Sequence, residues 1–353
     1  MPDLDPVDQE LLNVIQAGFP ITHAPFAEVA ARLETTEEQV ISRTARLREA
    51  RVIRQLSAIF DTRSLGYQST LVAMRFEPDR LEQGAAIINE HPGVSHNYRR
   101  NHDFNLWFTL ATPPGSDIDR TLERLHELSG AVVTRKLQTL KLFKIGVKLD
   151  MTGTKDVTRQ EDPDYTGIQR DFALRSPLSD RDIRVIRAVQ DDLPLVPHPY
   201  AEAARSQGME EDELFAGMED LRQRGHLRRV AAILHHRRAG YAANAMAVWA
   251  VPEERAEDLG RRMAEFAAVS HCYQRPVYED WRFNLFSMIH GRKLADCEKI
   301  VGAIREAIGI DDYAVLYSTK EYKKTRVRYF TPELEEWEAS HLGIGTPARP
   351  SAF

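Results

Sequence analysis

Two short stretches of the chain combine the residue types that could bind an anionic ligand and exchange a proton with it. Residues 96–108 read HNYRRNHDFNLWF, and residues 271–286 read HCYQRPVYEDWRFNLF. Arginine pairs with carboxylates through two parallel hydrogen bonds, and histidine titrates near neutral pH. Bulky apolar residues flank the polar ones in both stretches. This mixture indicates a pocket for a large, flat, polyanionic ligand.

The polar residues alternate along each stretch as they would on a β-strand. Successive side chains of a strand point to opposite faces, so His96, Tyr98 and Arg100 share one face. The second copy repeats this trio as His271, Tyr273 and Arg275. Arg99 points to the other face of the strand. The sequence fits equally well an Arg99 that lies on the surface and one that contacts the ligand.

Some of these residues also have a purely structural interpretation. Asn105 and Asn284 could simply hydrogen-bond backbone groups, and His290 ends a predicted strand and fits either role. A single histidine on a strand is usually exposed or merely hydrogen-bonded. His96 and His271 recur at equivalent places in a repeat, however, and this recurrence favours a functional role for both.

The motif occurs twice because the chain is an internal duplication. Residues 4–78 match residues 178–252 at a constant shift of 174, which makes Arg54 equivalent to Arg228. The shift becomes 175 at the histidine of the motif and, after a four-residue insertion, 179 at its Phe-Asn-Leu element. The insertion leaves His102 without a clear counterpart. The sequence leaves open whether each half forms a pocket of its own.

Each half predicts the same series of secondary-structure elements. Three short amphipathic helices come first. In the first half, residues 51–60 follow them, where apolar and polar residues alternate as in a strand pair or wing. Three helices followed by a small wing are the winged helix-turn-helix pattern. A strand, a helix, two strands, a helix and a last strand at residues 132–147 follow in the ferredoxin-like βαββαβ order. We therefore expect an α+β fold, a tandem duplication of a winged helix plus a ferredoxin-like domain. The expected boundaries are winged helix 1–63, ferredoxin-like domain 64–150, linker 151–176, winged helix 177–237, ferredoxin-like domain 238–330 and tail 331–353.

Composition restricts the function classes. The chain has 353 residues, 42% of them hydrophobic and 28% charged, as in an ordinary globular protein. Its net charge of -6 disfavours nonspecific nucleic-acid binding. Only two cysteines are present, which fits a reducing cytoplasm. No signal peptide is recognisable at the start, and no apolar run reaches the roughly 18 residues that a membrane helix needs.

The layout and the motif together resemble a known family. A winged helix followed by a ferredoxin-like domain is the plan of the Lrp/AsnC regulators. The His-x-Tyr-x-Arg element followed by Phe-Asn-Leu is similar to the signature of the siroheme decarboxylases, Lrp/AsnC relatives that became enzymes. This resemblance covers residues 1–150 and 177–330. Members usually work as two homologous subunits, so this chain resembles a natural fusion of the pair, an intramolecular pseudo-dimer with its sheet domains face to face. Further association into a homodimer stays open.

The resemblance implies a reaction as well as a fold. The family removes CO2 from the acetate side chains at carbons 12 and 18 of siroheme, giving didecarboxysiroheme for heme d1 synthesis or an alternative heme route. It implies no redox cofactor and no metal of the protein's own, because the iron arrives with the siroheme substrate.

On this hypothesis the candidate residues take two roles. His96 and His271 are the general acids that protonate the methylene carbon after CO2 leaves. The residues expected to bind the substrate are Arg54, Tyr98, Arg99, Arg100, His102, Arg228, Tyr273 and Arg275. As an alternative role, His96, His102 or His271 ligates the siroheme iron.

Two other functions fit the same layout: a transcriptional regulator that senses a small molecule, and a tetrapyrrole-binding protein without catalysis. A helix that reads DNA needs cations near the phosphates. The third helix of the first half begins with Glu37 and Glu38, and that of the second half begins with the acidic run at residues 210–213. These acids disfavour the regulator, and they favour a structural role for the winged helices.

Overall fold

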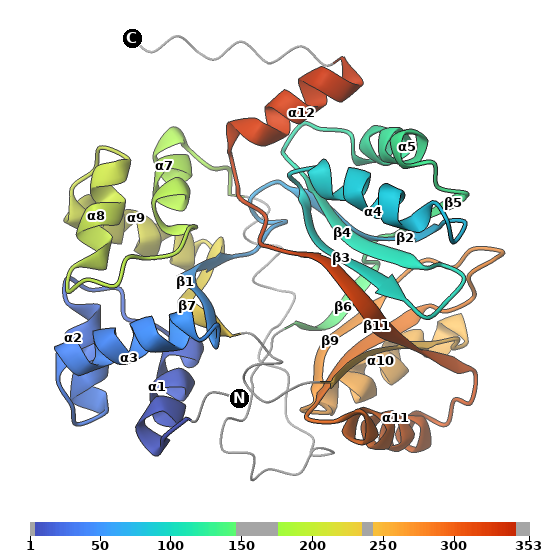
Figure 1. Ribbon diagram of the computed structural model, residues 1–353, viewed down its shortest axis with the longest axis horizontal. Coiled ribbons are helices and arrows are strands. Elements are labelled where there is room, and N and C mark those ends of the chain that lie inside the picture. Colours follow the sequence, from blue (N-terminus) through green and yellow to red (C-terminus); the bar gives the residue numbers. More distant parts are fainter. Residues whose placement is uncertain (1–3, 146–175, 235–242, 344–353) are drawn as a thin grey trace.

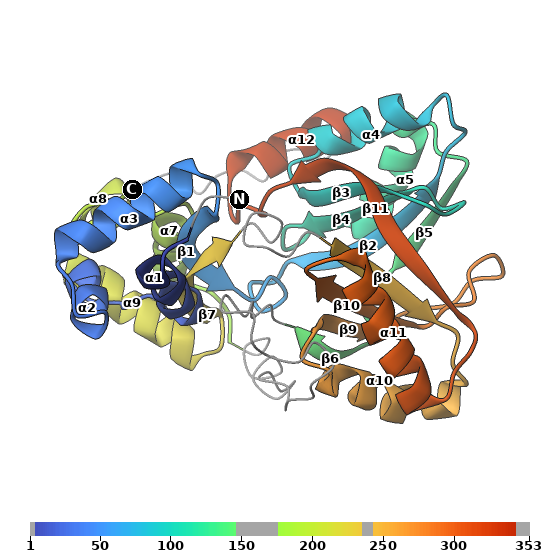
Figure 2. The same cartoon turned by 60° about the horizontal axis from the view of Figure 1, so that its bottom comes forward.

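The computed structural model describes residues 4–145, 176–234 and 243–343 (Figure 1). The predicted linker lies outside these residues except for its last position, Ser176. The winged-helix modules form one lobe and the sheet domains form the other, as Figures 1 and 2 show. Within the described residues, no helix combines the length and the hydrophobicity that crossing a bilayer requires.

The three predicted helices are present in each half. In the first half they are α1 (Pro6–Ala17), α2 (Pro25–Arg32) and α3 (Glu37–Glu49). In the second half they are α7 (Asp180–Val189), α8 (Pro199–Ser206) and α9 (Glu211–Gln223). Thr36 caps α3, because its side chain accepts a hydrogen bond from the backbone N–H of Gln39.

Residues 51–60 do not form the predicted strand pair or wing. They form a single strand, β1 (Ile53–Phe60), which pairs antiparallel with β7 (Leu227–Leu234) of the second half. A lone strand leaves its backbone groups unpaired, and the equivalent strand of the other half supplies the missing partner. Leu56 and Val230 consequently lie in one hydrophobic core shared by both modules.

The sheet domains form one continuous sheet of nine strands in the order β5-β2-β4-β3-β11-β8-β10-β9-β6. In the first half the strands are β2 (Gln68–Arg75), β3 (Val94–Arg100), β4 (Leu106–Thr112), β5 (Val133–Leu137) and β6 (Lys141–Ile145). In the second half they are β8 (Ala243–Trp249), β9 (Val269–Gln274), β10 (Leu285–Gly291) and β11 (Tyr313–Lys324). Four helices cover the outer faces, namely α4 (Leu81–Glu90), α5 (Ile118–Ser129), α10 (Ala256–Glu265) and α11 (Leu294–Ile308). Each half thus has the predicted βαββαβ order.

The last strand of each half extends into the other half, which corrects the single strand predicted at residues 132–147. That segment divides into β5, which pairs with β2, and β6, which pairs with β9 of the second half. The long strand β11 likewise pairs first with β8 and then with β3 of the first half. The two halves are therefore joined at both edges and face each other, as the intramolecular pseudo-dimer requires.

The residues after β11 also pack onto the first half. The helix α12 (Pro332–Leu342) lies against α5, and its Trp337 and Leu342 belong to the core of the first sheet domain. The segment predicted as a tail therefore begins with an ordered helix. Residues 344–353, at the end of the predicted tail, lie outside the described residues.

Gly93, which precedes the strand that carries His96, has no room for a side chain. A Cβ built there would lie 1.9 Å from the carbonyl oxygen of Ala111 on the backbone of β4. We expect Gly93→Ala to lower the free energy of unfolding by at least about 2 kcal/mol, because neither backbone can move without disturbing the pairing of β3 and β4. Gly302→Ala in α11 is the control. A Cβ built at Gly302 has no other atom within 4 Å, and alanine is about 1 kcal/mol more favourable than glycine inside a helix. Denaturant unfolding of both variants checks the opposite signs.

Candidate active site

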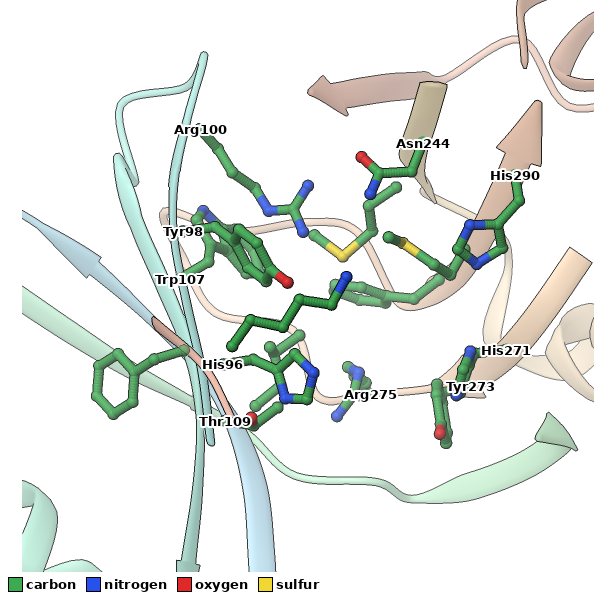
Figure 3. A pocket seen from close by; sticks show the side chains of 16 residues that line it. His96, Tyr98, Arg100, Trp107, Thr109, Asn244, His271, Tyr273, Arg275 and His290 are labelled. Carbon is green, nitrogen blue, oxygen red and sulfur yellow. The ribbon is translucent and has the colours of Figure 1, made fainter. Parts of the chain in front are cut away.

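A pocket between the facing halves of the sheet brings the two copies of the motif together. Its volume is about 300 Å³, at the lower end of the range for small-molecule sites. The trio from β3 and the trio around β9 enter it from opposite sides (Figure 3). All six residues of the two trios line it, namely His96, Tyr98, Arg100, His271, Tyr273 and Arg275. The two halves therefore share this site.

Arg100 and Arg275 enter the pocket as buried cations. Each reaches across to the last strand of the other half: Arg100 donates from Nη1 to the carbonyl oxygen of Leu316 at 3.0 Å, and Arg275 donates from Nη1 to that of Leu137. Only 6% of Arg100 and 7% of Arg275 is exposed. Burial lowers the pKa of each guanidinium to about 10, so both stay charged at neutral pH.

Neither arginine has an acidic partner in the part of the chain that the structure describes. Each stands within 6 Å of the ring of its neighbouring tyrosine, but the Nε of each lacks a hydrogen-bond acceptor. The described lining of the pocket also contains no Asp or Glu. Buried charges are costly unless they are paired. The pocket is therefore built to receive anionic groups from a ligand.

The serine before each histidine holds the imidazole in place. Ser95 Oγ lies 3.0 Å from His96 Nδ1, and Ser270 Oγ lies 2.8 Å from His271 Nδ1. Because Nδ1 is engaged, Nε2 is the nitrogen that would exchange a proton with a ligand. Burial, with the charges of Arg228 and Arg275, lowers the pKa of His271 to about 4. The imidazole is therefore neutral at pH 7 until an anion binds beside it and raises its pKa.

Aromatic and sulfur-containing side chains form the apolar wall of the pocket. Trp107 and Phe286 line it, and Met246 and Met288 fill the wall beside them. Behind the wall, Trp281 packs against Trp107 with ring centroids 5.2 Å apart. An apolar wall beside buried cations suits a flat ligand that carries charges at its edge.

Arg54 and Arg228, which the repeat makes equivalent, lie close to the pocket without appearing in its described lining. Arg54 donates from Nη2 to the carbonyl oxygen of Lys324, a lining residue, at 3.0 Å. Arg228 pairs with Asp61 at 3.2 Å, and its charge acts on His271. Both arginines therefore contribute positive charge around the site from the β1–β7 pair.

Arg99 and His102 do not lie where a direct role in substrate binding would place them. Arg99 is exposed on the opposite face of β3, as strand alternation requires, and it is absent from the pocket lining. His102 is also absent from the lining and belongs to the turn after β3. Its Nδ1 accepts a hydrogen bond from the N–H of Phe104 at 3.0 Å, and its ring packs 5.3 Å from that of Trp281.

The structure adds four polar residues to the site, the first of them Thr109 on β4. Asn244 and Lys324 line the pocket, as does His290, for which the sequence fits either of two roles. Lys324 pairs with His96 across the β11–β3 ladder. No local motif marks Asn244 or Lys324, because strand pairing between distant segments places them there.

Asn105 and Asn284 have the structural role that the sequence allows. The side chain of Asn105 accepts from the N–H of Phe76 at 3.0 Å and donates to its carbonyl at 2.8 Å. Asn284 makes the same pair of bonds with Val251, at 3.0 and 2.9 Å. The Phe-Asn-Leu element therefore fixes the end of a neighbouring strand, and the His-x-Tyr-x-Arg element supplies the pocket.

Comparison with known proteins gives the same division of the chain. The family described as AsnC-like ligand binding domain matches residues 64–144 and 238–323. The family described as siroheme decarboxylase NirDL-like HTH domain matches residues 8–54 and 182–228. These matches agree with two helix-turn-helix modules and two ligand-binding domains in tandem.

Full-length relatives extend this similarity over nearly the whole chain. The siroheme decarboxylase of Hydrogenobacter thermophilus is 40% identical over 329 residues, which cover 93% of this chain and 96% of that protein. The siroheme decarboxylase NirDL subunit of Paracoccus pantotrophus is 32% identical over 326 residues, which cover 91% and 96%.

A solved structure agrees with the fold as well as the sequence. The crystal structure of the siroheme decarboxylase NirDL superposes with a TM-score of 0.73 at 34% identity, over 96% of this chain and 99% of that one. A second crystal structure, with the same TM-score, identity and coverage, holds NirDL in complex with an iron-uroporphyrin III analogue. The chain belongs to the siroheme decarboxylase family, in the form that fuses the two homologous halves in one polypeptide.

Proposed function

We propose that this chain removes CO2 from the acetate side chains at carbons 12 and 18 of siroheme, giving didecarboxysiroheme. The observation that carries the proposal is the pair of buried guanidinium groups, Arg100 and Arg275, which face one pocket without acidic partners among the described residues. Siroheme carries eight carboxylates on a flat macrocycle. An apolar wall and two fixed cations match such a ligand, and the relative solved with an iron-uroporphyrin III analogue binds a ligand of the same class.

The reaction needs a proton and no external oxidant or reductant. The bond between the methylene carbon and the carboxylate breaks, CO2 leaves, and the electron pair passes into the macrocycle and the methylene carbon. A proton then converts that carbon into a methyl group. We therefore propose that no redox cofactor is required and that the iron comes only with the substrate.

His96 and His271 are the residues we assign as proton donors. Both line the pocket, and a positioned acid accelerates proton transfer about 10²–10⁴-fold. Arg100 and Arg275 hold carboxylates at the edge of the ring, with Tyr98 and Tyr273 beside them. The apolar wall favours the change from a charged carboxylate to neutral CO2. The cytoplasm is the proposed location, since both cysteines are buried free thiols.

The winged helices are poor candidates for reading DNA, because their cations serve the fold. Arg43 and Arg46 on α3 bind Asp8 of α1. On α9, Arg222 pairs with Glu219, and just beyond it Arg224 bridges to Asp182 and Asp220. Cations that are already paired release few counterions from a phosphate backbone. This observation favours the enzyme over a regulator.

Incubation of the purified protein with siroheme without oxygen tests the proposal, with mass spectrometry and absorbance as the two measurements. Loss of two CO2 units from siroheme is the expected result. An absorbance change without loss of mass would instead identify a tetrapyrrole carrier. Absence of both effects, together with retention of a specific DNA fragment, would identify a regulator.

A further inference from the structure

The second half of the site contains a chain of hydrogen bonds behind its histidine. Ser270 Oγ lies 2.8 Å from His271 Nδ1 and also 2.8 Å from His290 Nε2. Both histidines line the same side of the pocket, as Figure 3 shows. Only 4% of Ser270 and 8% of His290 is exposed. A buried hydroxyl therefore connects two imidazoles that both face the ligand space.

The first half lacks the titratable end of this chain. There Ser95 Oγ contacts His96 Nδ1 at 3.0 Å and, on its other side, Thr109 Oγ1 at 2.8 Å. The sequence shift of 179 that relates β4 to β10 places Ala111 at the position equivalent to His290. Threonine has no proton to release near neutral pH. The two halves thus differ in what lies behind an otherwise equivalent histidine.

We propose that Ser270 and His290 relay a proton to His271 for one of the two decarboxylations, and this inference rests on the proposed function. A hydroxyl donates one hydrogen bond and accepts two, so Ser270 can accept from His290 at 2.8 Å and direct its one proton either to the carbonyl oxygen of Met288 at 3.2 Å or to His271 at 2.8 Å. The relay uses the orientation toward His271. The relay belongs to the second half alone, and the first half protonates its acetate through His96 without it.

The relay conserves atoms and charge. As CO2 leaves, the methylene carbon takes the proton on His271 Nε2, His271 Nδ1 takes the hydroxyl proton of Ser270, and Ser270 takes a proton from His290 Nε2. The relay requires His290 to begin this step as an imidazolium, a form that a bound carboxylate beside it would favour, and leaves it neutral at the end. One proton from water restores His290, and exchange with water after product release restores the starting tautomer of His271.

Single-turnover measurements with saturating siroheme test the relay in Ser270→Ala, Ser270→Thr and His290→Gln. We expect Ser270→Ala and His290→Gln to slow one of the two decarboxylations about 10–100-fold, less than the full 10²–10⁴-fold contribution of a general acid because His271 itself remains, with siroheme affinity within about twofold. Ser270→Thr keeps a hydroxyl and should restore most of the rate. For the wild type, a plot of the rate of that step against the deuterium fraction of the solvent should be curved, because more than one proton moves in the step. The two slow variants should give a straight line.

Ser95→Ala is the matched comparison, because it removes the equivalent hydroxyl where no second histidine follows. It should slow the other decarboxylation by less, and the deuterium dependence of that step should not change shape. The relay is overturned if Ser270→Ala and His290→Gln keep both rates, or if Ser95→Ala reproduces their effect. A wild-type protein that releases no CO2 would instead overturn the proposed function, and the relay with it.

Discussion

Replacing Arg100 or Arg275 by methionine is expected to weaken siroheme binding about 10–100-fold for each arginine. A hydrogen bond to a charged group contributes about 1.5–3 kcal/mol, and each 1.4 kcal/mol corresponds to a factor of ten. Methionine keeps much of the length of the side chain and removes only the charge and the donors. Titration of siroheme followed by absorbance measures the loss, and the double variant should lose the effects of both arginines.

The same substitutions should leave the stability of the ligand-free protein nearly unchanged. Removing an unpaired buried charge is favourable, whereas losing the hydrogen bond to Leu316 or Leu137 costs about 1 kcal/mol. Arg99→Met is the control, because Arg99 lies exposed on the same strand and should affect neither binding nor unfolding. Unchanged siroheme affinity in both pocket variants would show that the two arginines do not hold the substrate.

Local periodicity explains why the sequence could identify the trios of the pocket. His96, Tyr98 and Arg100 lie on one uninterrupted strand, so alternation alone determines that they share a face and that Arg99 does not. The repeat then transfers the same conclusion to His271 and its neighbours. Side chains whose placement depends on one element can be predicted from that element.

The meeting of the two trios depends on contacts that no local pattern records. β6 and β11 each leave their own half and pair with an edge strand of the other. Lys324 reaches the site through its register opposite His96, and nothing in its surrounding sequence indicates this. The prediction of a strand pair or wing at residues 51–60 was wrong for the same reason: the strand that pairs with β1 lies in the second half, far away in the sequence.

His102 shows how an insertion can mislead a comparison of repeats. Its lack of a counterpart suggested a special role in the first half. In the structure the longer loop of the second half carries Trp281, whose ring packs against His102. The turn therefore uses His102 to accept a backbone hydrogen bond and to contact that longer loop. Sequence alignment registers the asymmetry, and only the contact explains it.

His96→Ala and His271→Ala are each expected to slow one of the two decarboxylations by about 10²–10⁴, the contribution of a general acid. Siroheme binding should change little, because both arginines remain. The positions of the two reacting acetates, on neighbouring pyrrole rings, are related by a two-fold rotation about an axis in the plane of the macrocycle. The internal repeat relates the two trios by an approximate two-fold rotation as well. Each variant should therefore accumulate a monodecarboxylated product, and the two products should retain different acetates. Mass spectrometry counts the CO2 lost, and nuclear magnetic resonance identifies the remaining acetate.

The outcome separates three roles of the histidines. If one variant blocks both steps, a single acid serves both acetates and the substrate must turn within the pocket. If a histidine ligates the siroheme iron instead, its alanine variant should change the absorbance spectrum of bound siroheme before any CO2 is released. If both variants keep both rates, neither histidine is the acid. His126→Ala provides the control, because His126 lies on α5 beside Thr134, outside the described lining of the pocket. A pocket that keeps one histidine for each acetate can complete both decarboxylations without releasing the intermediate, and the two different products would be direct evidence of that division.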